Sequence, residues 1–138
     1  MAKALGGVGR AVHVQRLAVL DGEPVALLNA YLDGVRFAAL AQERLHGSLY
    51  ARLARDFGVS LTSARNEIGL ATLTRDEAHV LRRKTKAAVL EVVSVTNDQH
   101  GTPTEYSRVL YDPERFRFRI DSHRHDESVV RLLAPSHP

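Results

Sequence analysis

Two apolar runs joined by a tight-turn sequence constrain the fold of this chain more than any other feature. Residues Ala11–Leu20 are rich in valine and leucine and contain neither glycine nor proline, which is typical of a β-strand. Residues 21–24 then read Asp-Gly-Glu-Pro, and an Asp-Gly pair readily adopts the positive φ angles of a hairpin turn. Residues 25–32 predict the returning strand. The chain therefore begins with a β-hairpin, which belongs in an antiparallel sheet.

Later segments add further strands to this prediction. Residues 61–73 are expected to be extended, and residues 88–96 form a run rich in β-branched side chains. Residues 104–111 and 115–121 each follow a short turn that contains proline, and they predict two more strands. Successive strands joined by short turns form an antiparallel meander.

Two segments carry helix signals. The first begins after Ser48, has leucine or phenylalanine at every fourth position and ends at Gly58, where a left-handed cap is expected. The second begins with a capping box formed by Thr74 and Glu77 and extends to about Leu81. We expect both helices to pack on one side of the sheet. The predicted fold class is α+β, an antiparallel sheet flanked by helices.

Composition narrows the class of protein. The chain has 138 residues, the size of one domain, here assigned to residues 1–122 with a polar tail at residues 123–138. It has no cysteine, which excludes disulfides, thiolate metal clusters and cysteine nucleophiles. No apolar run reaches the roughly 18–20 residues of a membrane span and no secretory signal is present, so we expect a cytoplasmic protein without membrane contact.

The charge pattern does not indicate a nucleic-acid surface. The net charge is only +3, and acidic and basic residues alternate along most of the chain. The densest basic run, residues 82–86, is expected to be the solvated end of a helix, where cations suit the backbone carbonyls.

Polar residues at inward-facing strand positions are candidate binding residues. Arg16 lies in an apolar strand, and a buried arginine needs an anionic partner, either a protein carboxylate or an anionic ligand. Glu105, at the start of a later strand, is either the internal partner of Arg16 or Arg65 or an acceptor for ligand hydroxyl or amino groups. The residues alone leave both alternatives open.

Ser48 precedes the first predicted helix and adds a different kind of candidate. The first backbone N–H groups of a helix lack partners and carry partial positive charge, so they bind anions. A serine at this position is also an ordinary N-cap that satisfies the same donors. Arg16 and Ser48 together would form a carboxylate or phosphate pocket if the fold brings them close.

Other patterns offer little chemistry. A His-x-His pair at residues 123 and 125 could touch a metal, but it lies in the polar tail and is expected to be solvated. The chain contains no Gly-x-Ser-x-Gly nucleophile elbow, no P-loop and no dinucleotide-binding glycine pattern. We expect no metal, no cofactor and no catalytic residues.

A set of short motifs occurs in order between about residues 9 and 121. They are Gln15-Arg16-Leu17, Asp21-Gly22-Glu23-Pro24-Val25-Ala26, Gly47-Ser48-Leu49-Tyr50, Phe57-Gly58-Val59, Gly101-Thr102-Pro103-Thr104-Glu105-Tyr106-Ser107 and the segment from Tyr111 to Phe118. The set resembles the UTRA domain, the effector-binding half of GntR-type transcription regulators of the HutC subfamily. The resemblance implies a chorismate-lyase-like fold, which agrees with the fold class predicted above.

The same resemblance implies binding of a small metabolite and candidate contacts for it. In family members that bind sugar phosphates, the matching positions are Arg16 and Ser48 at the phosphate, with Glu105 and Tyr111 at the remainder of the ligand. Arg65 is included as a further candidate ligand contact. Tyr111 lies six residues beyond Glu105, roughly 20 Å in a straight strand, so both touch one ligand only if the strand bends or the ligand bridges them.

Two departures from the family pattern qualify this implication. Ala18 stands where the family often has a second arginine, which leaves room for a carboxylate or a less charged ligand instead of a phosphate. Residues 112–114 read Asp-Pro-Glu in place of the usual Arg-Gly-Asp-like turn. The winged helix-turn-helix of such regulators is missing and the front of the effector domain looks shortened, so the chain is either a fragment or a naturally short protein.

The leading hypothesis is therefore an effector-binding, homodimer-forming domain that is not an enzyme and meets DNA only through a separate winged helix-turn-helix. The expected effector is a sugar phosphate, a carboxylate or a similar metabolite. One alternative is a lyase-like enzyme on the same fold, with Glu105 as general acid or base beside Arg16. The other is a dimerisation remnant with an unused pocket.

Overall fold

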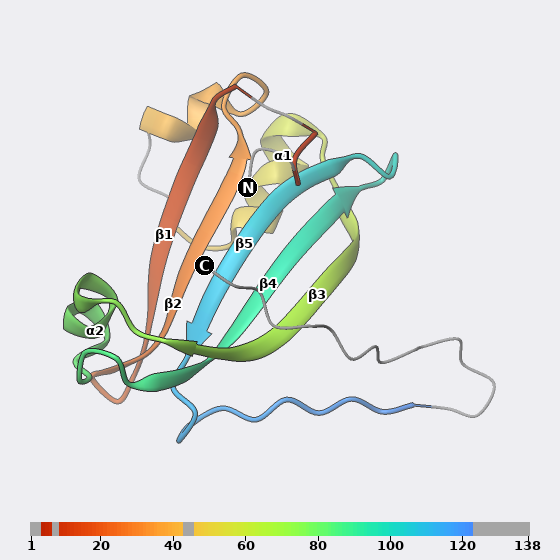
Figure 1. The fold of residues 1–138 in the computed structure, drawn as a ribbon. Helices are drawn as coiled ribbons and strands as arrows, with labels where there is room; N and C mark the ends of the chain where they lie inside the picture. Colours follow the sequence, from red (N-terminus) through yellow and green to blue (C-terminus); the bar gives the residue numbers. More distant parts are fainter. Residues whose placement is uncertain (1–3, 7–8, 43–45, 123–138) are drawn as a thin grey trace.

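One five-stranded antiparallel sheet forms the body of the molecule (Figure 1). The structure is a computed structural model, and it describes residues 4–6, 9–42 and 46–122. The predicted polar tail at residues 123–138, with its His-x-His pair, lies outside the described residues. The spatial order of the strands is β1-β2-β5-β4-β3. Their bounds are β1 Ala11–Leu20, β2 Glu23–Asp33, β3 Leu61–Thr72, β4 Ala88–Asp98 and β5 Pro103–Tyr111.

The predicted hairpin and the later strands are confirmed. Asp21 and Gly22 take φ angles of 51° and 79°, the left-handed values that a tight turn between β1 and β2 requires. β5 is the central strand and pairs with β2 on one side and β4 on the other. Glu105 on β5 consequently lies opposite Leu32 of β2 and Thr96 of β4, well inside the sheet.

Both predicted helices are present, α1 at Leu49–Phe57 and α2 at Arg75–Leu81, and a short 3-10 helix occupies Ala38–Gln42. Ser48 is the N-cap of α1, and Gly58 ends that helix with a φ of 65°. The capping box of α2 is complete, since the side chains of Thr74 and Glu77 each accept a hydrogen bond from the other residue's backbone N–H.

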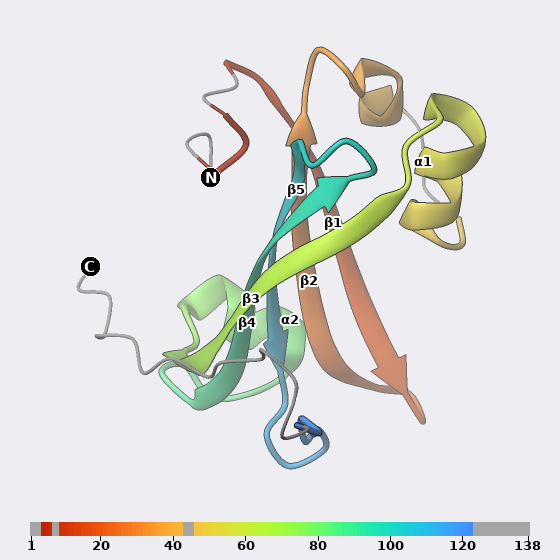
Figure 2. The same ribbon diagram turned by 90° about the vertical axis from the view of Figure 1, so that its right-hand side faces the viewer.

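The expectation that both helices pack on one side of the sheet is wrong, because they cover opposite faces (Figure 2). Ala30 and Leu32 of β2 pack in the same cluster as Leu53 of α1. Leu27 points the other way and packs with Ala78 of α2. Since neighbouring strand residues point to opposite faces, the apolar residues of β2 contribute to a core on each side of the sheet.

The predicted last strand, residues 115–121, is also wrong. The backbone N–H groups of Arg115 and Phe116 donate to the carbonyl of Asp112, which turns the chain sharply after β5. Both neighbours of β5 are already in place, so no position beside it is open for a returning strand. The rings of Phe116 and Phe118 instead pack edge-on against Tyr111, with centroid distances of 4.8 and 5.2 Å.

Candidate functional site

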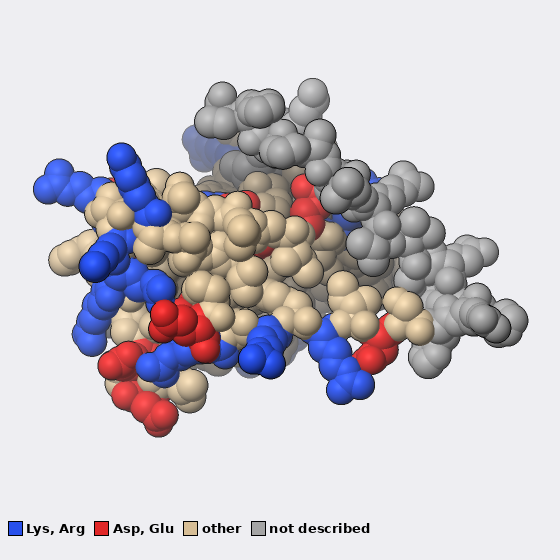
Figure 3. All heavy atoms as spheres, turned by 60° about the horizontal axis from the view of Figure 1, so that its bottom comes forward, with Lys and Arg blue, Asp and Glu red and all other residues tan. Residues whose placement is uncertain are grey.

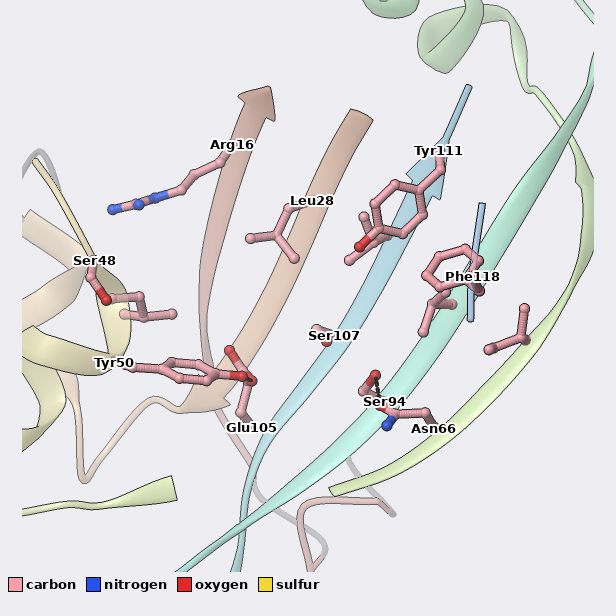
Figure 4. Close-up of a pocket in the computed structure, with 14 residues that line it drawn as sticks. Arg16, Leu28, Ser48, Tyr50, Asn66, Ser94, Glu105, Ser107, Tyr111 and Phe118 are labelled. Carbon is pink, nitrogen blue, oxygen red and sulfur yellow. Dashed lines mark hydrogen bonds between the residues drawn. The ribbon is translucent and has the colours of Figure 1, made fainter. Parts of the chain in front are cut away.

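A cavity of about 500 Å³ lies on the face of the sheet that α1 covers (Figure 4). The first turn of α1 forms one wall, and the inward-facing side chains of the strands form the floor. β5 supplies Glu105, Ser107 and Tyr111, because alternate residues of a strand share one face. The polar residues that line the cavity are Arg16, Ser48, Tyr50, Asn66, Ser94, Glu105, Ser107 and Tyr111. Four of the five predicted site residues are thus brought together.

Arg16 carries the most informative group of the cavity. Its Nη1 donates to the backbone carbonyl of Gly47, directly before α1. Its Nη2 is buried and has no hydrogen-bond acceptor among the described residues, and none of their carboxylates forms an ion pair with it. A buried donor without an acceptor is costly. Of the two partners that the sequence left open, the described residues do not supply the protein carboxylate.

Ser48 lies across the cavity from Arg16, which points toward it in Figure 4. Its Oγ accepts a hydrogen bond from the N–H of Ala51 at 3.2 Å, so it is an ordinary N-cap. This capping bond satisfies one of the first N–H groups of α1, while the helix end retains its partial positive charge. The guanidinium of Arg16 and the positive end of α1 therefore face the same cavity.

Glu105 is almost completely buried, with 2% of its surface exposed. It accepts a hydrogen bond from the hydroxyl of Tyr50 at 2.8 Å and another from Thr96. Burial raises the pKa of the Glu105 carboxyl, and these two hydrogen bonds oppose that rise. Its partner is therefore Tyr50, and not Arg16 or Arg65.

Tyr50 was not predicted from the sequence, although it follows Ser48 closely at the start of α1. Burial, and next the charge of Glu105, raise the pKa of Tyr50 to about 12. The Tyr50 hydroxyl accordingly stays protonated at neutral pH and serves as a donor. It connects the helix wall of the cavity to the sheet floor.

The far end of the cavity is more aromatic. Tyr111 lines it, burial raises the pKa of its hydroxyl, and Phe118 covers the ring. Asn66 of β3 and Ser94 of β4 also line it, and the Ser94 hydroxyl donates to Oδ1 of Asn66 at 2.6 Å. The sequence did not predict these two residues either. Since Glu105 and Tyr111 line one cavity, a ligand that contacts both has to extend along β5.

Arg65 is not brought to this cavity. Its neighbours Asn66 and Ile68 line the cavity from β3, and the alternation of the strand turns Arg65 to the opposite face, beside Glu67. There it borders a separate hollow.

The basic run at residues 82–86 lies at the end of α2. Arg82, Lys84 and Lys86 are exposed there, and Arg83 pairs with Asp112 at 2.6 Å. In Figure 3 the basic side chains of this face gather toward the side where α2 lies, with acidic side chains among them. This arrangement agrees with a solvated helix end.

The described residues contain no group of three or more histidine or acidic side chains placed to hold a metal ion. Within the same part of the chain, none of the helices has the length and apolar character needed to cross a bilayer.

Comparison with known proteins identifies the family. A family model described as the UTRA domain matches residues 2–117. The chain belongs to the UTRA domain family. This UTRA domain is 30% identical over 103 residues to the HTH-type transcriptional regulator RB1450 of Rhizobium meliloti, covering 74% of this chain and 42% of that protein. It is 24% identical over 120 residues to the HTH-type transcriptional repressor NagR of Bacillus subtilis, covering 86% and 49%.

Solved structures agree with this assignment. The crystal structure of the effector domain of PhnF from Mycobacterium smegmatis is similar with a TM-score of 0.79 at 27% identity, covering 88% of this chain and 76% of that one. The fold class predicted from the sequence and the resemblance to GntR-type regulators are thereby confirmed. The chain spans about half the length of the curated relatives it matches. It is a regulatory effector-binding domain by family.

Proposed function

We propose that this UTRA domain binds one small anionic metabolite in the cavity beside α1, and that binding alters how a separate winged helix-turn-helix domain holds its operator. The observation that carries the proposal is Arg16, which lines the same cavity as the positive end of α1 and whose buried Nη2 has no acceptor among the described residues. A carboxylate or phosphate oxygen placed between Arg16 and Ser48 accepts hydrogen bonds from both sides.

The remainder of the ligand is expected to be polar with hydroxyl or amino groups. Glu105 has oxygen lone pairs beyond those used by Tyr50 and Thr96, so it suits a ligand donor. The aromatic surface of Tyr111 and Phe118 favours an apolar or sugar-like face at the far end. With Ala18 in place of a second arginine, a single guanidinium serves the anion, which favours a carboxylate over a phosphate.

Binding would connect α1 to the sheet, since the anion lies between Arg16 of β1 and the first turn of α1. A ligand shifts a regulator between two arrangements only if its affinity for the two differs. The element we expect to respond is α1, held to the sheet by the hydrogen bond from Tyr50 to Glu105.

A thermal-shift screen tests this proposal. The purified chain is melted against a panel of sugar phosphates, sugar acids and amino-sugar derivatives, and a bound metabolite raises the melting temperature by mass action. The same screen on Arg16→Gln should lose the shift. Arg55→Gln, which removes an exposed arginine of α1 outside the cavity, should keep it. A panel in which no anion stabilises the chain, or equal shifts in Arg16→Gln, would contradict the proposal.

We further propose that the domain is not an enzyme. Glu105 with its raised pKa is the only group that favours acid–base chemistry among the described cavity residues, and it is held by Tyr50 and Thr96. The measurement is turnover of chorismate or a related enol ether under conditions where a metabolite binds. Product formation that depends on Glu105 would overturn this part of the proposal.

A further inference from the structure

A second hollow of about 410 Å³, the side groove, adjoins the cavity toward strand β1. The residues that line both hollows are Arg16, Leu28, Val109 and Tyr111. Figure 4 shows Leu28 between Arg16 and Tyr111 on the face of the sheet that both hollows share. A molecule bound beside Arg16 can therefore extend into the side groove without leaving the surface of the protein.

The floor of the side groove is formed by two alanines that lie side by side. Ala18 of β1 pairs with Ala26 of β2, and both line the groove. The neighbouring pair on the same face is Arg16 with Leu28, about 6–7 Å further along the strands. The two small side chains thus leave a trough beside the taller pair.

Two aromatic rings bound this trough. Tyr111 of β5 pairs with Ala26 on the other side of β2. Phe116 packs edge-on against Tyr111 with a centroid distance of 4.8 Å, because the chain turns back after Asp112. Both rings line the side groove, which therefore has an aliphatic floor and an aromatic wall.

The side groove differs in chemistry from the cavity that it adjoins. Among the described residues that line it, Arg16 is the only charged one, and the hydroxyl of Tyr111 is the only other polar side-chain group. Leu17 also lines it and is 41% exposed. Covering apolar surface that is open to water is favourable. A guanidinium beside an apolar trough complements a molecule that has an anionic head and an apolar tail.

We propose that the effector of this domain is an amphipathic carboxylate, with its anion at Arg16 and an apolar alkyl or aryl tail in the side groove over Ala18 and Ala26. The inference rests on the function proposed above, since it needs an anion at Arg16. It adds the class of the effector, because a tail made only of hydroxylated carbons finds few hydrogen-bond partners in the groove. Polar groups nearer the head remain compatible with Glu105, which lines the cavity and not the side groove.

A series of carboxylates of increasing length tests the tail. Butyrate, hexanoate and octanoate are titrated into the purified chain by isothermal titration calorimetry. Affinity should rise about two- to fourfold for each added methylene, until the side groove is filled. The heat-capacity change of binding should become more negative along the series, as expected for burial of apolar surface. Affinities that agree within twofold from butyrate to octanoate would overturn the inference.

Ala18→Ile tests where the tail lies, because it places a larger side chain in the trough. Ala18 is exposed on an edge strand, so circular dichroism should show an unchanged fold. The variant should keep the affinity for butyrate and lose most of the gain for octanoate. Gln15→Ile is the matched control, since Gln15 lies on the same strand and lines a hollow on the opposite face. Equal chain-length dependence in the two variants would contradict the assignment to the side groove.

Arg16→Gln separates this inference from the proposed function. It should weaken the binding of every member of the series, and hexylamine, which has the tail without the carboxylate, should not bind. Sugar acids or phosphates that bind through Arg16, with no gain from an apolar tail, would refute the inference and leave the proposed function intact. Octanoate binding that survives Arg16→Gln, or equal binding of hexylamine, would refute the pairing of head and tail. Failure of every carboxylate and phosphate to bind would refute both.

Discussion

Replacing Tyr50 by phenylalanine removes the hydroxyl that donates to the buried carboxyl of Glu105. A hydrogen bond to a charged group contributes about 1.5–3 kcal/mol. Because Tyr50 is half exposed and water replaces part of the lost interaction, we expect a loss of about 1–2 kcal/mol of unfolding free energy at pH 7. For a domain of this size that corresponds to a melting temperature lower by roughly 4–8 °C.

The loss of stability in Tyr50→Phe is expected to depend on pH. Burial raises the pKa of Glu105 in the folded chain. The folded state therefore binds this proton more tightly than the unfolded state does. The resulting gain in unfolding free energy is complete below the ordinary pKa of a glutamate, and it is lost as the pH rises through the higher pKa of the folded chain. Tyr50→Phe removes a hydrogen bond that lowers this pKa and should raise it further. The destabilisation should therefore be larger at pH 7 than at pH 4, where Glu105 is mostly protonated.

Urea unfolding at the two pH values measures both effects. Tyr106→Phe is the matched control, since Tyr106 lies on the opposite face of the sheet and its hydroxyl has no hydrogen bond to a described residue. An equal loss at pH 4 and pH 7, or no loss beyond that of Tyr106→Phe, would refute the role assigned to Tyr50.

Four further substitutions test other parts of the structure. Leu53→Ala, at a side chain with no exposed surface, should lower the unfolding free energy in urea by about 2–5 kcal/mol. Gly58→Ala should lower it by about 1 kcal/mol, because alanine is strained at a φ of 65°. Ser48→Ala and Thr74→Ala each remove an N-cap and should cost about 1 kcal/mol in the same assay. Only Ser48→Ala should also weaken metabolite binding in calorimetry, and equal affinities of the two variants would exclude Ser48 as a contact.

Local signals predicted most of the secondary structure. The turn at residues 21–24, the cap at Gly58 and the capping box at Thr74 and Glu77 each depend on neighbouring residues only, and each was found as expected. Such features need no knowledge of how distant segments meet.

The wrong or missing predictions concern features that depend on tertiary packing. The alternation of residues 115–121 suits a strand, but a strand needs an open neighbour, and β5 has none. The sequence did not show which face of the sheet each helix covers, because β2 has apolar side chains on both of its faces. Tyr50 was not predicted as a site residue because its hydrogen bond to Glu105 forms only when the fold brings α1 beside β5, and the two residues are 55 positions apart in the chain.

The central claim is that Arg16 anchors an anion in this cavity. Isothermal titration calorimetry with the metabolite that most raises the melting temperature tests it directly, on the wild-type chain, Arg16→Gln and the control Arg55→Gln. Loss of a charge-assisted hydrogen bond of about 1.5–3 kcal/mol corresponds to a dissociation constant roughly 10- to 150-fold higher for Arg16→Gln. Arg55→Gln should match the wild type. An affinity of Arg16→Gln within twofold of the wild type would contradict the account.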